Sequence, residues 1–237
     1  MENIEQYDHW FDKDRSESSS VRVSRKFNNI DILNPGLGLN IYQNAISQDN
    51  VNKYVNILEN NLSKNGPYKW SQALVTNSDA PIKKARDCQD FKFKSEHLGP
   101  RGKHNEELID MYDEIYSVLK QCIDDYSYYW GINVNYYEAF NFVKYEGAGQ
   151  EFKIHADHGP AYNCTVSAVI YLNDDYEGGD IFFPRLDKFS YKPKFGDIAI
   201  FPSNYIYEHA SLPMISGTKY CVVVMTDIND LSHGMHK

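Results

Sequence analysis

The sequence contains no run of roughly 18 or more apolar residues, which is what a membrane-spanning helix requires. It also contains no Cys-x-x-Cys pair, and its four cysteines lie far apart in apolar surroundings. We therefore expect buried, unpaired thiols rather than disulfides. The N-terminal residues, Met1–Glu5, lack the basic and then apolar layout of a secretory signal. Together these absences predict a soluble, cytoplasmic protein.

Basic residues are in the minority, with 24 Lys and Arg against 33 Asp and Glu, for a net charge of −9 at pH 7. Because general nucleic-acid binding needs a basic surface, this balance argues against a nucleic-acid partner. The 237 residues are enough for one large domain with a buried core, and the hydrophobic fraction of 42% is near the globular norm. The sequence does not indicate an oligomeric state.

The chain divides by composition into an arm and a domain. Residues 1–30 are polar and charged, so we expect a flexible or peripherally docked N-terminal arm. We expect residues 31–237 to form a single domain. In it, residues 31–132 would provide helical support and residues 133–228 the β-rich core, with a frayed tail over 229–237.

Two helices are predicted in the first half. Apolar residues recur at helical spacing from Val51 to Leu58, behind Ser47 as a plausible N-cap, and Gly66 followed by Pro stops the pattern. The longer series from Leu108 to Tyr129 advances in steps of three and four, which places its apolar residues on one stripe of a helix. We expect this second helix to end at Trp130-Gly131.

Beyond the second helix the apolar pattern changes to a period of two in short runs separated by turn residues. The strand-like segments cover residues 134–143, 152–157, 164–172, 180–183, 198–201, 205–210 and 220–226, with earlier ones at 38–42, 71–75 and 91–93. Many short strands after a helical half predict an α+β fold, in which helices pack on a β-sandwich or barrel.

The pair His155-Ala156-Asp157 carries the first chemical signal. Side chains at i and i+2 of a strand point to the same face, so this imidazole and carboxylate can converge on one metal ion. His209 is the candidate third ligand, and two histidines with one carboxylate suit non-haem Fe(II) oxygenases. Taken singly, each of these residues is more often structural. His158 is a rival ligand by proximity, but on a strand it would point to the opposite face from Asp157.

Lys219 opens the apolar strand-like segment 220–226. A cation that enters a strand facing a core needs an anionic partner, and a bound carboxylate would meet that need. The alternative is a lysine at a strand start whose amine lies in solvent.

The order and spacing of several motifs together are more specific than any one of them. In sequence these are Tyr145, His155-x-Asp157, Tyr171-Leu172-Asn173-Asp174, Glu177-Gly178-Gly179-Asp180, Gly196-Asp197-(x)3-Phe201-Pro202, His209 and Lys219. Over about residues 135–228 this pattern resembles the 2-oxoglutarate- and Fe(II)-dependent dioxygenases, and more narrowly the prolyl 4-hydroxylase group. The resemblance implies a double-stranded β-helix, or jelly-roll, core buttressed by N-terminal helices.

The resemblance also implies a set of roles. His155, Asp157 and His209 would be the catalytic residues that hold Fe(II), and Lys219 would pair with the distal carboxylate of 2-oxoglutarate. The implied reaction consumes 2-oxoglutarate and O2, releases succinate and CO2, and hydroxylates an unactivated C–H bond. Ascorbate is a further cofactor candidate of this group.

Two tyrosines match cosubstrate-pocket positions of the same family. Tyr145 would line the pocket, and Tyr171 would hydrogen-bond the carboxylate that Lys219 binds. The alternative for both is an ordinary place in the barrel core. The turn Gly147-Ala148-Gly149 would let the chain fold back, so that Tyr145 and Asp157 reach one pocket.

The implied substrate is a prolyl residue in a peptide or protein. Alternatives are a small molecule or free amino acid and, third, a jelly-roll binding module without catalysis. Lys144 stands where many prolyl hydroxylases have Arg, which leaves open a substrate contact. Trp70, Tyr137 and Tyr162 are aromatic candidates for stacking on a substrate.

Overall fold

The computed structural model describes residues 23–36, 38–50, 52–62, 67–75, 78–94, 98–100, 105–159 and 163–229. Most of the predicted arm, the predicted tail beyond residue 229 and the aromatic candidate Tyr162 lie outside these residues. The end of the predicted arm is a strand, Val23–Phe27, which pairs with Ile30–Gly36. The division into an arm over 1–30 and a domain over 31–237 stays a proposal.

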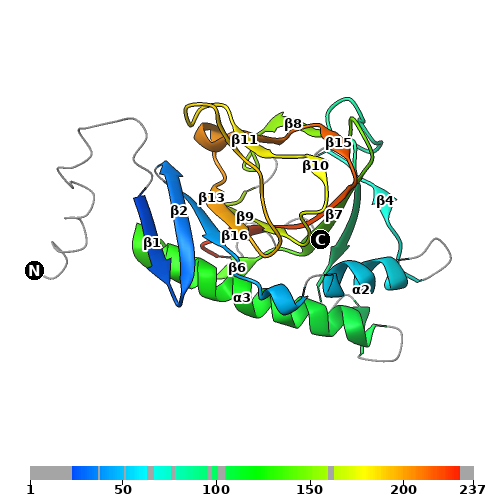
Figure 1. The fold of residues 1–237 in the computed structure, drawn as a ribbon, viewed down its shortest axis with the longest axis horizontal. Helices are drawn as coiled ribbons and strands as arrows, with labels where there is room; N and C mark the ends of the chain where they lie inside the picture. The colour runs from blue at the N-terminus through cyan, green and yellow to red at the C-terminus, as the bar shows by residue number, and fades with distance from the viewer. Residues whose placement is uncertain are drawn as a thin grey trace, which may run out of the picture.

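A large antiparallel sheet forms the body of the protein (Figure 1). In spatial order its strands are β1 (Val23–Phe27), β2 (Ile30–Gly36), β3 (Leu39–Gln43), β13 (Ile198–Pro202), β9 (Val166–Tyr171), β16 (Thr218–Asp227), β7 (Phe140–Glu146), β5 (Gln89–Phe93) and β4 (Ser71–Gln72), and β6 (Tyr136–Tyr137) pairs with the end of β16. The segment 31–132 therefore supplies edge strands of this sheet as well as helices.

A smaller sheet faces the large one and completes the jelly-roll (Figure 1). Its strands are β12 (Phe189–Tyr191), β11 (Ile181–Phe183), β14 (His209–Ser211) and β8 (Phe152–His155), and a separate short pair joins β10 (Glu177–Gly178) to β15 (Met214–Ser216). The rings of Phe183 and Phe201, one from each sheet, meet edge-on with centroids 5.0 Å apart. The predicted α+β jelly-roll is confirmed.

Two helices cover the outer face of the large sheet (Figure 1). The long helix α3 (Glu106–Trp130) ends as predicted at Gly131, whose φ of 67° is the left-handed conformation that glycine adopts without cost. The shorter helix α2 (Lys53–Asn61) begins later than predicted, with Asn52 at its N-cap. The Ser47 hydroxyl instead accepts from the Asp49 amide at 3.2 Å, ahead of the 3-10 turn Gln48–Asn50. The Ser47 cap prediction was therefore wrong.

The central strands are buried on both faces, and alternate residues belong to two cores. On β16, Val222 packs toward the helices whereas Cys221 packs between the sheets. Ile170 and Val169 divide in the same way on β9. This alternation explains why these strands read as continuous apolar runs, because each face needs an apolar side chain.

One predicted strand is partly a helix. Residues 205–210 form the 3-10 turn η5 (Tyr205–Tyr207) followed by β14. The Asn204 side chain accepts a hydrogen bond from the Ile206 amide at 3.0 Å, and this cap stabilises the turn in place of an extended strand.

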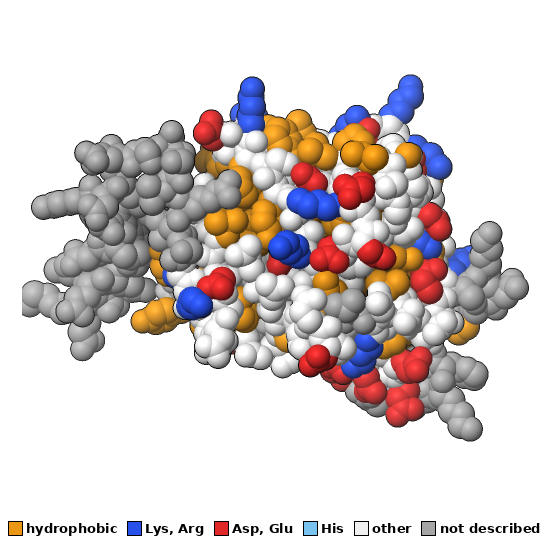
Figure 2. Space-filling model, viewed as in Figure 1, with side chains coloured by type: hydrophobic (Ala, Val, Ile, Leu, Met, Phe, Trp, Pro, Cys, Tyr) orange, Lys and Arg blue, Asp and Glu red, His pale blue; other side chains and the backbone are white. Residues whose placement is uncertain are grey.

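Three further observations bear on the predictions from composition. All four cysteines are buried and unpaired, as expected. No helix among the described residues combines the length and hydrophobicity that crossing a membrane demands. On the face shown in Figure 2, basic and acidic side chains are interspersed.

Candidate active site

The three candidate metal ligands meet at one point of the smaller sheet. His155 is the last residue of β8, and His209, the first of β14, lies directly opposite it in the antiparallel pairing. Asp157 follows two residues after His155, just beyond the strand. The potential ligand atoms of the three residues all lie within 4.8 Å of one another.

Hydrogen bonds orient both imidazoles toward that point. His155 Nδ1 lies 2.7 Å from the Lys153 carbonyl oxygen, and His209 Nδ1 lies 3.2 Å from that of Tyr207. Because a carbonyl can only accept, each Nδ1 carries the proton, and each Nε2 keeps a free lone pair. The Nε2 atoms of His155 and His209 lie 3.5 and 3.8 Å from the Asp157 carboxylate.

The charge states also suit a divalent cation. Burial lowers the pKa of His209 to about 4, so its imidazole is neutral at neutral pH. Burial alone would raise the pKa of the Asp157 carboxyl, but the adjacent His209 and His155 outweigh it and lower this pKa to about 2. The site therefore offers two imidazole nitrogens and a carboxylate.

One carboxylate oxygen lacks a partner. The Asp157 side chain is 5% exposed, and its buried Oδ2 makes no hydrogen bond with any residue that the structure describes. An unpaired buried carboxylate oxygen is costly, and a metal ion would compensate it. Two nitrogens and one oxygen on one side of an ion are the donor set of non-haem Fe(II) sites, so these residues fit Fe(II).

The three ligands line a cavity that also contains Lys219. Its empty space is about 590 Å³, which includes the part that is open to solvent. Lys219 is 2% exposed, so the alternative of an amine in solvent is wrong. Its ammonium donates to the Gly179 carbonyl and, at 3.0 Å, to the Ser211 hydroxyl. Burial lowers the pKa of Lys219. Among the described residues no carboxylate lies within ion-pairing distance of Lys219 Nζ.

Both candidate tyrosines stand beside this lysine. In the strand pairing Tyr145 lies opposite Lys219, and Tyr171 lies opposite Cys221. The ring centroids of Tyr145 and Tyr171 are 5.3 and 5.4 Å from Lys219 Nζ. Burial raises the pKa of both phenols well above the ordinary value, so both stay neutral donors. They belong to the core between the sheets and also line the cavity.

The glycine turn between Tyr145 and His155 links the two sheets. Gly147 and Gly149 have φ values of 96° and 84°, which residues with a Cβ rarely adopt. Through this turn the chain passes from β7 in the large sheet to β8 in the smaller one, and Tyr145 and Asp157 line one cavity.

Three site residues escaped the sequence analysis. The Phe152 ring stacks on the His155 imidazole with centroids 3.6 Å apart, and Arg86 Cζ lies 4.9 Å from the centroid of the Phe152 ring. Ser211 contacts Lys219. Ser211 could have been found, because it lies two residues after His209 on a strand. Phe152 lies three residues before His155, and strand alternation would have placed it on the opposite face. Arg86 had no signal, because a loop bridge brings it to Phe152.

A second cavity, with about 1140 Å³ of empty space, opens beside the metal ligands. It shares His155, Asp157 and Arg86 with the first cavity. Leu74, which is exposed, and Met225 contribute apolar surface to it.

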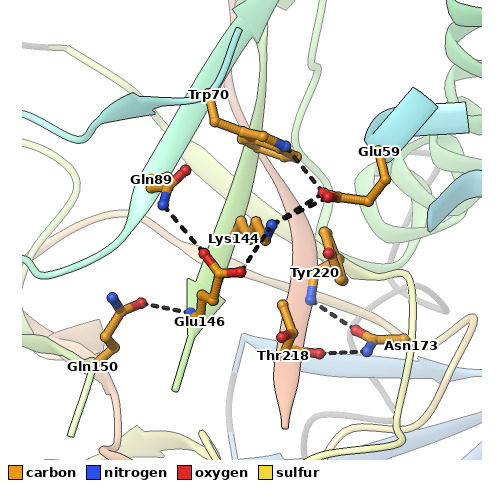
Figure 3. Close-up of polar contacts among 9 residues, drawn as sticks. All are labelled: Glu59, Trp70, Gln89, Lys144, Glu146, Gln150, Asn173, Thr218 and Tyr220. Atoms are coloured by element: carbon orange, nitrogen blue, oxygen red, sulfur yellow. Dashed lines mark hydrogen bonds and ion pairs between the residues drawn. The ribbon is translucent and has the colours of Figure 1, made fainter. Parts of the chain in front are cut away.

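Lys144 lies outside both cavities. It lies on the opposite face of β7 from Tyr145, and Figure 3 shows it between Glu59 and Glu146. Its Nζ lies 3.2 Å from the Glu59 carboxylate and 3.4 Å from the Glu146 carboxylate. Trp70 donates to the same Glu59 at 3.1 Å (Figure 3). The ion pair with Glu59 links Lys144 on the large sheet to helix α2, on the side away from the two cavities.

Other candidates from the sequence also lie away from the cavities. Trp70 packs against Tyr220, with ring centroids 6.2 Å apart, and Tyr137 packs edge-on against Tyr116. Neither Trp70 nor Tyr137 is among the residues that line these two cavities. His158 makes its contacts with the Cys164 backbone and is not among the three grouped ligands.

Comparison with known proteins agrees with this geometry. Residues 140–226 match the family model of the 2OG-Fe(II) oxygenase superfamily. No curated protein sequence matches the chain significantly. Among solved structures, a prolyl hydroxylase from Trichoplax adhaerens, in complex with a hypoxia inducible factor peptide fragment, is similar at 15% identity and a TM-score of 0.63, over 84% of this chain and 87% of that one.

Two further structures show the same fold. A viral collagen prolyl hydroxylase from Paramecium Bursaria Chlorella virus-1 is 20% identical, with a TM-score of 0.55 over 81% of this chain and 96% of that one. A Pseudomonas putida prolyl-4-hydroxylase is 15% identical, with a TM-score of 0.59 over 81% and 93%.

Residues 140–226, which contain the three grouped ligands and Lys219, are thus a 2OG-Fe(II) oxygenase superfamily domain, and as an enzyme the protein is a 2-oxoglutarate-dependent dioxygenase. Its cofactor and cosubstrates are accordingly Fe(II), 2-oxoglutarate and O2. Its fold follows those of the prolyl hydroxylases over most of both chains.

Proposed function

We propose that His155, Asp157 and His209 hold the Fe(II) ion and that Lys219, with Tyr171 and Tyr145, holds 2-oxoglutarate. When bound, the iron and 2-oxoglutarate supply the oxidative decarboxylation that activates O2 and yields succinate and CO2. The unpartnered Asp157 oxygen and the two oriented Nε2 atoms support the metal assignment. All three ligands approach from one side, which leaves room for small ligands opposite.

The chain's contribution at the cosubstrate end is a buried positive charge. The Lys219 ammonium lies in the same cavity as the metal ligands and has no carboxylate partner among the described residues. A carboxylate bound there would remove the cost of the isolated charge. The neutral Tyr171 phenol can donate a hydrogen bond to the same group. Apolar walls around these residues exclude water from the reacting centre.

We further propose that the substrate is a prolyl residue in a peptide or protein, which is hydroxylated at an unactivated C–H bond. The observation that supports this substrate class is the second cavity, which is lined both by the exposed Leu74 and by the candidate ligands His155 and Asp157. Two of the similar structures are named for peptide or collagen hydroxylation. A free small molecule is the alternative that the substrate experiment below distinguishes.

Succinate release provides the test of the chemistry. Purified protein is loaded with Fe(II) and 2-oxoglutarate without oxygen, and succinate is then measured after O2 is admitted. We expect turnover in the wild type, none in Asp157→Ala, and unchanged turnover in the control Asp174→Ala, which alters an exposed carboxylate. Equal turnover in wild type and Asp157→Ala would remove the metal assignment.

Substrate class needs a separate measurement. Peptide libraries that contain proline, matched libraries with alanine in its place, and free proline are incubated with the loaded enzyme. We expect mass spectrometry to find one added oxygen on the proline peptides alone. Oxygen added to free proline, and not to peptides, would establish the small-molecule alternative instead.

A further inference from the structure

Ser211 connects the metal-binding strand to the buried lysine. It is the last residue of β14, two positions after His209, so both side chains point between the sheets. Its hydroxyl accepts a hydrogen bond from Lys219 Nζ at 3.0 Å. Ser211 lines the cavity that contains the metal ligands.

The Lys219 ammonium retains one donor. Of its three N–H groups, one is used by the Gly179 carbonyl and one by Ser211. This close approach depends on glycine, because a Cβ at Gly179 would lie 3.1 Å from Lys219 Cδ and 2.7 Å from Met214 Sδ. The lysine is thus held from two sides, and its third N–H remains for a ligand.

The Ser211 hydroxyl also retains its proton. It accepts from Lys219 Nζ, and its own O–H donates to no acceptor among the residues that the structure describes. One O–H and one N–H therefore stay available at adjacent positions. Two adjacent donors match the two oxygens of one carboxylate.

We propose that Ser211 is a cosubstrate-binding residue, which together with Lys219 binds the distal carboxylate and selects 2-oxo acids that carry one. This inference rests on the proposed 2-oxoglutarate site and adds a residue on the smaller sheet to it. Ser211 joins that sheet to Lys219 on the large sheet, so the bound carboxylate would be held by both walls of the jelly-roll.

The test compares two five-carbon ligands, 2-oxoglutarate and 2-oxopentanoate, which differ only in the distal carboxylate. Their affinities are measured by calorimetry on the Mn(II)-loaded protein. We expect Ser211→Ala to bind 2-oxoglutarate about 10-fold more weakly, as for the loss of a hydrogen bond to a charged group, and to bind 2-oxopentanoate as the wild type does. Ser211→Thr, which keeps the hydroxyl, should restore the 2-oxoglutarate affinity. The matched control is Ser216→Ala, at an exposed residue of strand β15 (Met214–Ser216).

Several outcomes would overturn the inference. Equal weakening of both ligands by Ser211→Ala would show a structural role for the serine, and unchanged affinity for 2-oxoglutarate would show that its hydroxyl makes no contact with the carboxylate. If the wild-type protein bound Mn(II) but no 2-oxoglutarate, the proposed cosubstrate site would itself fail. The wild-type measurement therefore separates failure of the proposed function from failure of this residue's role.

Discussion

His209 lies directly opposite His155 in the β14–β8 pairing, and the two imidazole centroids are 4.4 Å apart. Each ring presents Nε2 because its Nδ1 is held by the carbonyl of the residue two positions earlier. The backbone of two neighbouring strands thus orients both ligands before any metal binds. Such preorganisation reduces the loss of side-chain entropy on metal binding.

Acid should destabilise the metal-free protein through His209. In the unfolded chain its pKa is the ordinary 6.5, whereas in the native protein it is about 4. Between these values the unfolded chain binds a proton that the native chain does not, so the free energy of unfolding falls as the pH falls. From pH 6.5 to 4.5 we expect His209 to account for a loss of about 2 kcal/mol.

Urea unfolding of the metal-free wild type and His209→Gln across this range measures that loss. The variant should show a shallower dependence on pH, because glutamine does not titrate. Asp157 acts in the same direction, but its lowered pKa confines its effect to the range between its ordinary 3.8 and about 2. Parallel pH profiles for the two proteins would contradict the low pKa of His209.

Replacing Lys219 should separate stability from function. Lys219→Met removes a buried charge that has no carboxylate partner among the described residues but keeps much of the side-chain volume. We expect the metal-free protein to become more stable, by about 1–3 kcal/mol, because the desolvation cost of the ammonium disappears. The same variant should lose 2-oxoglutarate binding.

Chemical denaturation and calorimetry check the two halves of the Lys219 prediction independently. Lys153→Met, at an exposed lysine on β8, is the control that should change neither property. A less stable Lys219→Met protein would indicate that the lysine contributes net stability through Gly179 and Ser211.

The Phe152 ring should support metal binding through His155. Phe152→Leu keeps an apolar side chain but removes the stacked ring that holds the imidazole. We expect metal affinity to fall about 10-fold, as for loss of a group that orients a ligand. Anaerobic Fe(II) titration measures this affinity, and Phe189→Leu on β12 of the same sheet is the control. Unchanged affinity in Phe152→Leu would mean that the Nδ1 hydrogen bond alone orients His155.

Lys144 should matter little to catalysis. Its ion-pair partner Glu59 is 41% exposed, so Lys144→Met should cost about 1 kcal/mol or less in the free energy of unfolding. Because the lysine lies outside both cavities, kcat/KM for a peptide substrate should not change. A large loss of kcat/KM without a loss of stability would restore the substrate contact that the sequence left open.

The sequence by itself determined the strands, the long helix and the residue types of the site. Short, nearly continuous apolar runs identify the central strands, because each of these strands must place apolar side chains on two cores. The apolar stripe from Leu108 to Tyr129 identifies α3, because a helix that packs on a core needs one apolar face. The order and spacing of His155, Asp157, His209 and Lys219 among the surrounding motifs resembled a known family, and that resemblance predicted an iron-dependent oxygenase.

Only the tertiary structure decided which side chains meet. Pairing of β14 with β8 brings His209 to His155, and the packing of the two sheets brings Ser211 to Lys219. Arg86 reaches Phe152 from a loop, and Lys144 turns away from the cavity because it alternates with Tyr145 on β7. Contacts of this kind depend on strand register and on the facing of two sheets, and local spacing along the chain does not encode either.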